Sequence, residues 1–338
     1  MIAKSATLLL SLIFTTAIVG QASARCGGQN LMDTLTEQER GYIDAFVAET
    51  AYSTGRAFVA RRSTQHIFFY GIIDSGFGPD LPEAVRDGMK GAESMMFRTS
   101  SIDEAIFENQ LAGDPSLYAD TSGESLEKDL SEEQWAILTE RLDPLGWSTA
   151  DIESLHPWVV ADWAAFPLCE LEGQMNGAQT MEMMVEDTSS TMRMPRSALE
   201  APVDYFNAMN ALSRDQQVDL LRWSLSVGGI DGVADLHRTV IALYGEGRTG
   251  AMWAIRDVIA GRNPPDNLAT EDARHVSYQA LIIDRHQEWL GPILFFSGMH
   301  PIFVAVGTDH LIGEDGLLRL LEKDGFSIER VMLDGEVE

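Results

Sequence analysis

The sequence predicts an α/β fold in which a central mixed sheet is covered by helices, with an α+β arrangement as the alternative. Two signals lead to this prediction: apolar runs of strand length lie toward the two ends of the chain, and well-marked helix starts fill its middle. The chain has 338 residues and 45% hydrophobic content, which is enough for one large globular domain. We therefore expect a single domain over residues 25–338, with a helical insertion over about 125–260.

Residues 1–24 have the character of a secretory signal peptide. Lys4 supplies a positive start, residues 6–20 form an apolar stretch too short to span a bilayer comfortably, and Ala22 to Ala24 form a small-residue cleavage site. We expect cleavage after Ala24 and a periplasmic or secreted mature protein. Since no later stretch has the length of a transmembrane helix, no membrane span is expected.

The chain contains two cysteines, Cys26 and Cys169. Arg25 precedes Cys26 where a lipoprotein signal places a small residue, which argues against a lipid anchor. In an oxidising compartment two lone cysteines often pair. A Cys26–Cys169 disulfide is one hypothesis and two unpaired thiols are the other, because the sequence does not give the distance between the two Cα atoms.

The charge balance excludes one class of partner. The chain has 24 Lys and Arg against 52 Asp and Glu, a formal net charge of -28. Nucleic acids and anionic lipids bind to basic surfaces, so we expect neither as the main partner. The remaining expectation is a peptide or protein partner whose identity the sequence does not give.

Helix starts are marked by capping boxes in three segments. TEQE at 36–39, SEEQ at 131–134 and SRDQ at 213–216 each place a hydroxyl residue three positions before Glu or Gln. Apolar periodicity follows each box. The glycine-rich GEGRTG at 245–250 matches a phosphate-binding pattern, but it follows helical rather than strand spacing, so we expect a connection between two helices.

Strand signals lie nearer to the ends of the chain. Four runs combine β-branched, aromatic or other apolar residues at strand length: 66–71, 94–97, 302–307 and 326–332. Helical patterns separate them, so the strands are expected to form one sheet covered by helices. Standard catalytic motifs are absent from the sequence: it has no HExxH, GxSxG, Walker A or CxxC pattern.

His310 is the histidine with the most informative position. It lies three residues past Gly307, where the apolar strand 302–307 ends, and ligands in α/β sheets gather beyond the carboxyl ends of strands. His66 and His300 lie at the opposite ends of their strands and are poor partners for it. For His286, which has a helical context, a surface or capping role is expected.

A second strand ends in the same way as the first. The early strand meets Gly71 and places Asp74 three positions on, just as Gly307 places His310. This pattern resembles the TraB/GumN family of bacterial proteins, related to the Tiki metalloproteases, whose early strand ends in GxxH, whose next strand ends in Glu and whose late strand ends in GxxH. The resemblance covers nearly the whole mature chain. It is strongest over 281–331, which includes DRHQEW and VAVGTDHLIGEDG, and the front end resembles the GumN-like exported branch.

The resemblance implies a site for a divalent ion that activates water, held by the histidine of each GxxH motif and by the glutamate. His310 keeps its position in this sequence, Asp74 replaces the first histidine, and Arg98 stands where the glutamate is expected. Gln179 stands at a further position that is often acidic, whereas Glu200 is retained. An active form would bind Mn, Co or Zn through Asp74, Glu200 and His310.

Arg98 decides how these changes are interpreted. A guanidinium stays protonated in proteins and has no lone pair for a cation, so it repels a metal instead of binding one. We hypothesise that Arg98 replaces the metal and pairs with Asp74 and Glu200, with His310 alongside. The alternative is that the alignment is off by one residue and Arg98 points into solvent.

Arg285 fits the arginine of the family's helix, although His286 follows it where the family has asparagine. Two roles remain open: Arg285 braces an acidic site residue, or it pairs with Asp284 on the helix surface.

Two classes of function follow from the resemblance. The first is an exported protein with a metallohydrolase-like fold whose metal site has degenerated, a pseudoenzyme that acts as a binding or regulatory module and needs no cofactor. The second is an active metal-dependent hydrolase, peptidase-like, that uses Asp74, Glu200 and His310.

Overall fold

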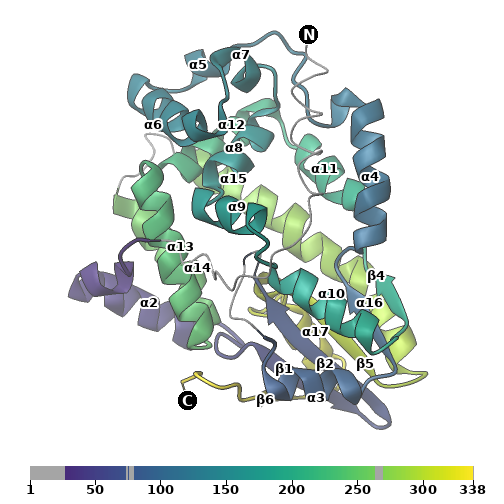
Figure 1. Ribbon diagram of the computed structural model, residues 1–338. Helices are drawn as coiled ribbons and strands as arrows, with labels where there is room; N and C mark the ends of the chain where they lie inside the picture. Colours follow the sequence, from purple (N-terminus) through teal and green to yellow (C-terminus); the bar gives the residue numbers. More distant parts are fainter. Residues whose placement is uncertain (1–26, 74, 76–79, 263–268, 338) are drawn as a thin grey trace.

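A computed structural model of the chain describes residues 27–73, 75, 80–262 and 269–337 and has the α/β fold that the sequence predicts. Its centre is a six-stranded sheet with the strand order β4-β3-β5-β2-β1-β6 (Figure 1). The strands are β1 (Ala57–Arg62), β2 (Gln65–Ile72), β3 (Ser94–Phe97), β4 (Arg196–Ala198), β5 (Ile302–Gly307) and β6 (Ser327–Val331).

The sheet is mixed, with one parallel half. Strands β4, β3, β5 and β2 run parallel to one another, whereas β1 is antiparallel to both β2 and β6. In the register of the parallel half, Ala305 of β5 lies beside Phe97 of β3 and Tyr70 of β2. The carboxyl ends of four strands therefore meet at one edge of the sheet.

The four expected strands are present as β2, β3, β5 and β6, each within two residues of the predicted bounds. Two strands were not predicted. β1 ends in Arg61 and Arg62, which interrupt its apolar run, and β4 has only three residues, Arg-Ser-Ala. β1 pairs with the adjacent β2 and with the distant β6, and β4 pairs with the distant β3, so pairing contacts and not an apolar pattern define them.

Helices surround the sheet and fill the middle of the chain. The α-helices are α2 (Glu37–Glu49), α3 (Glu83–Lys90), α4 (Ser101–Gly113), α5 (Leu126–Asp129), α6 (Glu132–Leu142), α7 (Thr149–Ile152), α8 (Pro157–Ala165), α9 (Leu168–Met175), α10 (Met181–Thr191), α11 (Pro202–Asn210), α12 (Arg214–Leu225), α13 (Ile230–Gly245), α14 (Thr249–Arg262), α15 (Ala269–Tyr278), α16 (Asp284–Ser297) and α17 (Leu317–Lys323). Shorter turns are η1 (Leu31–Thr34), η2 (Pro115–Leu117), η3 (Asp143–Leu145), η4 (Gln279–Ile283) and η5 (Thr308–His310). None of the described helices is both long and apolar enough to cross a membrane.

The predicted helix starts are confirmed by their caps. Thr36, Ser131 and Ser213 each accept a hydrogen bond from the backbone N–H three residues on, and the Glu or Gln there bonds back. The GEGRTG segment joins α13 to α14, as expected. Residues 125–260 contain α5 to α14 together with β4, which joins the sheet, and the helices α5 to α8 and α12 gather above the sheet in Figure 1.

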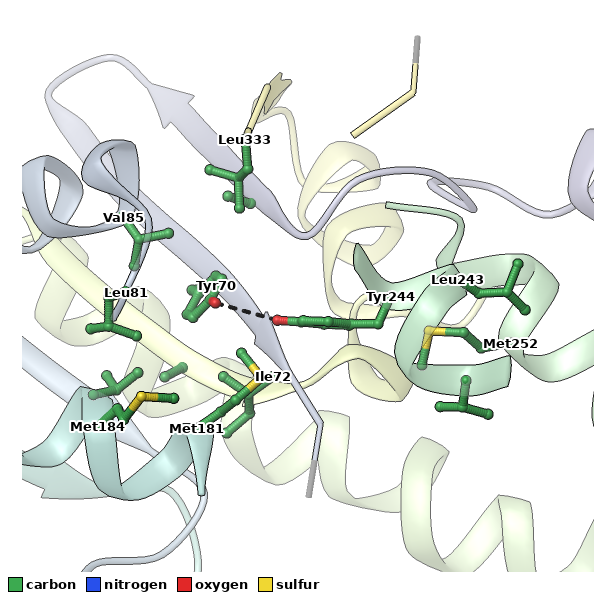
Figure 2. Close-up of a cluster of buried hydrophobic side chains, with 14 of the residues drawn as sticks. Tyr70, Ile72, Leu81, Val85, Met181, Met184, Leu243, Tyr244, Met252 and Leu333 are labelled. Carbon is green, nitrogen blue, oxygen red and sulfur yellow. Dashed lines mark hydrogen bonds between the residues drawn. The ribbon is translucent and has the colours of Figure 1, made fainter. Parts of the chain in front are cut away.

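Both faces of the sheet are buried. Alternate residues of the parallel strands, such as Phe303 and Val304 of β5, enter two separate apolar clusters. Helices α3, α10, α13 and α14 cover the first cluster, whereas α16 and α17 cover the second. Figure 2 shows the first cluster, where Tyr244 of α13 reaches β2: its hydroxyl donates to the Gly71 carbonyl at 2.7 Å and lies 3.3 Å from the Tyr70 hydroxyl.

Candidate functional site

Three candidate residues follow the carboxyl ends of neighbouring parallel strands. Arg98 comes directly after β3, Glu200 two residues after β4, and His310 three residues after β5 in the turn η5. The backbone holds the first two together, because the Glu200 N–H donates to the Arg98 carbonyl at 3.0 Å. Asp74, at the end of β2, lies outside the described residues, so its predicted pairing with Arg98 stays a prediction.

Glu200 is a buried carboxylate between two guanidinium groups. Its side chain is 2% exposed, and its Oε1 lies 3.5 Å from Nη1 of Arg98 and 3.4 Å from Nη1 of Arg285. Within the described part of the chain, neither carboxylate oxygen accepts a hydrogen bond that meets distance and angle criteria. Burial raises the pKa of Glu200, although Arg285 and Arg98 act in the opposite direction. The ionised carboxylate therefore depends on both arginines.

Arg285 contacts the site from helix α16. Its guanidinium lies 5.6 Å from the centre of the Tyr205 ring as well as beside Glu200. Asp284 instead accepts a hydrogen bond from Gln279 at 2.6 Å. Of the two roles considered for Arg285, the geometry corresponds to bracing an acidic site residue.

Two buried histidines form a chain of hydrogen bonds beside this ion cluster. His286 Nδ1 lies 2.7 Å from the Asp315 carbonyl, and His286 Nε2 lies 3.1 Å from His310 Nδ1. A carbonyl only accepts, so His286 carries its proton on Nδ1 and its Nε2 accepts the proton of His310 Nδ1. His310 is thereby left with a lone pair on Nε2. No hydrogen-bonding partner for that nitrogen is present among the residues that the structure describes.

Both imidazoles are held in the neutral form. Burial lowers the pKa of His286 to about 4, and burial together with His286, Arg285 and Arg98 lowers the pKa of His310 well below its ordinary value. The Trp289 ring packs 4.4 Å from the His310 ring, centre to centre. The cluster thus presents a neutral lone pair on His310 close to a region that carries two fixed positive charges.

The sequence model of the TraB/PrgY/gumN family matches residues 71–330 of this chain. The chain belongs to the TraB/PrgY/gumN family. No curated protein matches the chain. The matched segment runs from the end of β2 to the last strand and includes every residue of the cluster described above.

Two residues of the metal set that the family resemblance implies, Glu200 and His310, are described in the structure. His310 Nε2 has the lone pair that a ligand needs, but the Glu200 carboxylate is held by two guanidinium groups, one of them from Arg98. The described residues include no group of three or more His, Cys, Asp or Glu side chains that could hold a metal ion. This described set does not fit a divalent cation, and Asp74 lies outside it.

The other predicted residues lie elsewhere or outside the description. Gln179 is exposed and donates to Asp187 of α10 at 2.5 Å, with no contact to Glu200. Cys169 is not a free thiol, but Cys26 lies outside the described residues, so the disulfide between them stays a prediction.

The prediction for His286 was wrong. A surface or capping role was expected, but the residue is 0% exposed. The spacing of apolar residues in the sequence indicates this burial. His286, Trp289 and Ile293 lie at helical spacing on one face of α16, which is typical of a buried helix face. Tyr205 had no such signal, because α11 meets the site only through tertiary packing.

Proposed function

We propose that this TraB/PrgY/gumN family member is an exported binding or regulatory module that has the family's metallohydrolase-like fold and a degenerate metal site. The observation that carries the proposal is the position of Glu200 between Arg98 and Arg285, at 3.5 and 3.4 Å. The carboxylate that the family resemblance assigns to metal binding already has two cationic partners from the chain itself.

Electrostatics supports this proposal. A unit charge at about 4 Å contributes roughly 4 kcal/mol at an effective dielectric constant of 20. A divalent ion entering beside Glu200 meets two positive charges and competes for one carboxylate, so a metal must displace at least one guanidinium before it binds. Burial adds to this cost, because a displaced guanidinium needs another partner or water.

The alternative function is a peptidase-like hydrolase that uses Asp74, Glu200 and His310. One observation favours it. His310 donates from Nδ1 to His286, which leaves a lone pair on His310 Nε2. Metal-binding histidines are commonly held in this way, with one ring nitrogen donating a hydrogen bond and the other facing the metal.

Metal content discriminates between the two functions. The purified protein is analysed by elemental mass spectrometry as isolated and after incubation with Mn²⁺, Co²⁺ or Zn²⁺ followed by dialysis. We expect less than stoichiometric metal from the unaltered chain and a gain of metal binding in Arg98→Glu. Stoichiometric metal in the unaltered chain that is lost in His310→Ala overturns the proposal.

Peptide cleavage gives a second, independent readout. A mixed peptide library is incubated with the protein with and without Mn²⁺ or Co²⁺, and the products are identified by mass spectrometry. The proposal expects no new cleavage products. Cleavage that a chelator abolishes, and that His310→Ala also lacks, supports the hydrolase instead. Glu108→Gln, on the exposed face of α4, serves as a control variant.

A further inference from the structure

Strand β4 forms one end of the sheet. Among the described strands it pairs with β3 and with no other. All four residues of β3 are buried, whereas Arg196 of β4 is exposed and Ser197 and Ala198 are partly exposed. β4 is therefore an edge strand whose outer side has no strand partner among the described residues.

The hydrogen bonds between β4 and β3 show which backbone groups of β4 face outward. The Pro195 carbonyl accepts a hydrogen bond from β3 at 2.9 Å, and the Leu199 N–H donates one to β3 at 2.8 Å. Residues of a parallel strand turn alternately to one neighbour and the other. Ser197 therefore faces β3, and Arg196 and Ala198 turn their N–H and C=O groups outward. In the described chain, no backbone group bonds to these four outer groups.

A hollow of about 420 Å³ lies beside this open edge. The lining comes from the N-cap and first turn of α4, from α10, from β4 and from Met194, two residues before β4: Ser100, Ile102, Asp103, Glu186, Met194, Arg196, Ser197 and Ala198. The hollow thus combines unpaired strand backbone with side chains from two flanking helices.

The lining has apolar and acidic character. Ile102 of α4 lines the hollow and is 64% exposed, and Ile106, one helical turn further along α4 and outside the hollow, is 63% exposed. Glu186 is paired with Arg196 at 3.1 Å, so those two charges offset each other. The carboxylate of Asp103 adds a negative charge, in a chain with a formal net charge of -28. This surface complements a segment with apolar and basic side chains.

We propose that the open edge of β4 binds an extended peptide segment carrying lysine or arginine, which adds to the sheet as a further strand. The outward groups of Arg196 and Ala198 supply the backbone bonds, Ile102 contacts an apolar side chain, and Asp103 attracts the basic one. This inference rests on the proposed binding function, for which it names the ligand class.

Binding is measured by fluorescence anisotropy with a labelled short peptide of alternating Val, Thr and Lys, blocked at both termini, in the presence of a chelator. Two N-methylated versions separate strand pairing from general attraction, because each removes the N–H groups of one edge of the peptide. We expect one version to bind at least about tenfold more weakly and the other to bind nearly as well as the parent. Equal affinity of both versions overturns the proposal.

Two variants test the protein side. Ala198→Pro removes one outward N–H group, and Asp103→Asn removes the proposed charge partner. Each is expected to weaken binding several-fold, whereas Glu108→Gln, on the same helix outside the hollow, leaves it unchanged. Circular dichroism and a thermal melt establish that the variants are folded. The N-methylated peptides keep the test decisive if Ala198→Pro does not fold.

The outcomes separate this inference from the metal question. Binding of the basic peptide in chelator supports the inference whatever the metal content of the protein. Preference for a matched peptide with Glu in place of Lys overturns it, and so does binding that requires added Mn²⁺. A dimer in light scattering that Ala198→Pro dissociates also overturns it, because a second copy of the chain then occupies the edge.

Discussion

His286 Nε2 lies 3.1 Å from His310 Nδ1, and both side chains are buried at the carboxyl edge of the sheet. The Asp315 carbonyl accepts from the other nitrogen of His286 and so sets the tautomers of both rings. One backbone carbonyl thereby determines which nitrogen of His310 carries the proton.

The first prediction concerns removal of this bond. His286→Leu leaves the buried N–H of His310 without its acceptor, which we expect to lower the free energy of unfolding by about 2 kcal/mol. His286→Asn, which restores the residue that the family resemblance expects, offers an acceptor and is expected to lose less. Chemical denaturation measures both. If His286→Asn lowers the free energy of unfolding as much as His286→Leu does, the hydrogen-bond argument is contradicted.

Nitrogen NMR tests the tautomer itself. In the unaltered protein the His310 ring is expected to be neutral and protonated on Nδ1, with the signal of an unprotonated Nε2. In His286→Leu the preference for that tautomer is expected to weaken, because the acceptor is gone. Protonation of His310 on Nε2 in the unaltered protein contradicts the assignment.

The second prediction is a pH dependence of stability. The folded-state pKa of His286 is about 4, below the value of about 6.5 expected in the unfolded chain. The unfolded chain therefore takes up the proton first, so this contribution to stability is present above pH 6.5 and is lost as the pH falls toward 4. The slope from this group is at most about 1.4 kcal/mol per pH unit.

Comparison with a variant isolates this contribution from those of the many carboxylates. The free energy of unfolding is measured between pH 4 and pH 7.5 for the unaltered protein and for His286→Leu. We expect the two curves to converge as the pH falls, because the variant has no imidazole to protonate. A constant difference across this range rules out His286 as the titrating group.

The sequence predicts the end points of strands better than the contacts beyond them. The apolar run that ends at Gly307 correctly predicts that His310 follows the end of β5. The run SMMF correctly predicts that Arg98 follows the end of β3. The meeting of Arg98 with Glu200 depends on β4, a three-residue strand without an apolar pattern. Its pairing is set by packing in the folded chain, which local periodicity does not encode.

The same limit applies to the histidines. His286 and His310 are separated by 24 positions and lie on a helix and in a turn. The helical spacing of His286 with Trp289 indicates a buried face, but it does not identify the residue opposite. The family resemblance supplied Arg98, Glu200 and His310 and did not supply His286, because this chain departs from the family pattern there.

The third prediction concerns Arg141, a buried guanidinium in the helical middle. It is 3% exposed and donates to the backbone carbonyls of Ala164 at 3.0 Å and Ser224 at 3.1 Å, as well as to Gly228. Burial lowers the pKa of Arg141 to about 10. Arg141→Met leaves these carbonyls without donors, and we expect a loss of about 3 kcal/mol in denaturation. A loss below about 1 kcal/mol contradicts this role.

The fourth prediction concerns the cysteines and the leader. Mass spectrometry of the protein isolated from cells without reduction is expected to give an N-terminus at Arg25 and a mass two hydrogen atoms below that of the dithiol form. Proteolysis is then expected to release a peptide pair containing Cys26 and Cys169. Two alkylated thiols in the native protein contradict the disulfide, and a retained leader contradicts the export signal.

The fifth prediction tests the dependence of Glu200 on its arginines. Arg285→Met leaves a buried carboxylate with one guanidinium fewer, and we expect a loss of about 3 kcal/mol in unfolding free energy. Glu200→Gln removes the charge that Arg285 neutralises and is also expected to destabilise the fold. In the double variant neither charge remains, so the two losses should sum to more than the measured loss by at least about 1 kcal/mol. Arg319→Met, in an exposed ion pair on α17, is the matched control and is expected to leave stability nearly unchanged. Additive losses at Glu200 and Arg285 would mean that the 3.4 Å contact contributes nothing, and the proposal of an arginine-held site would lose its main support.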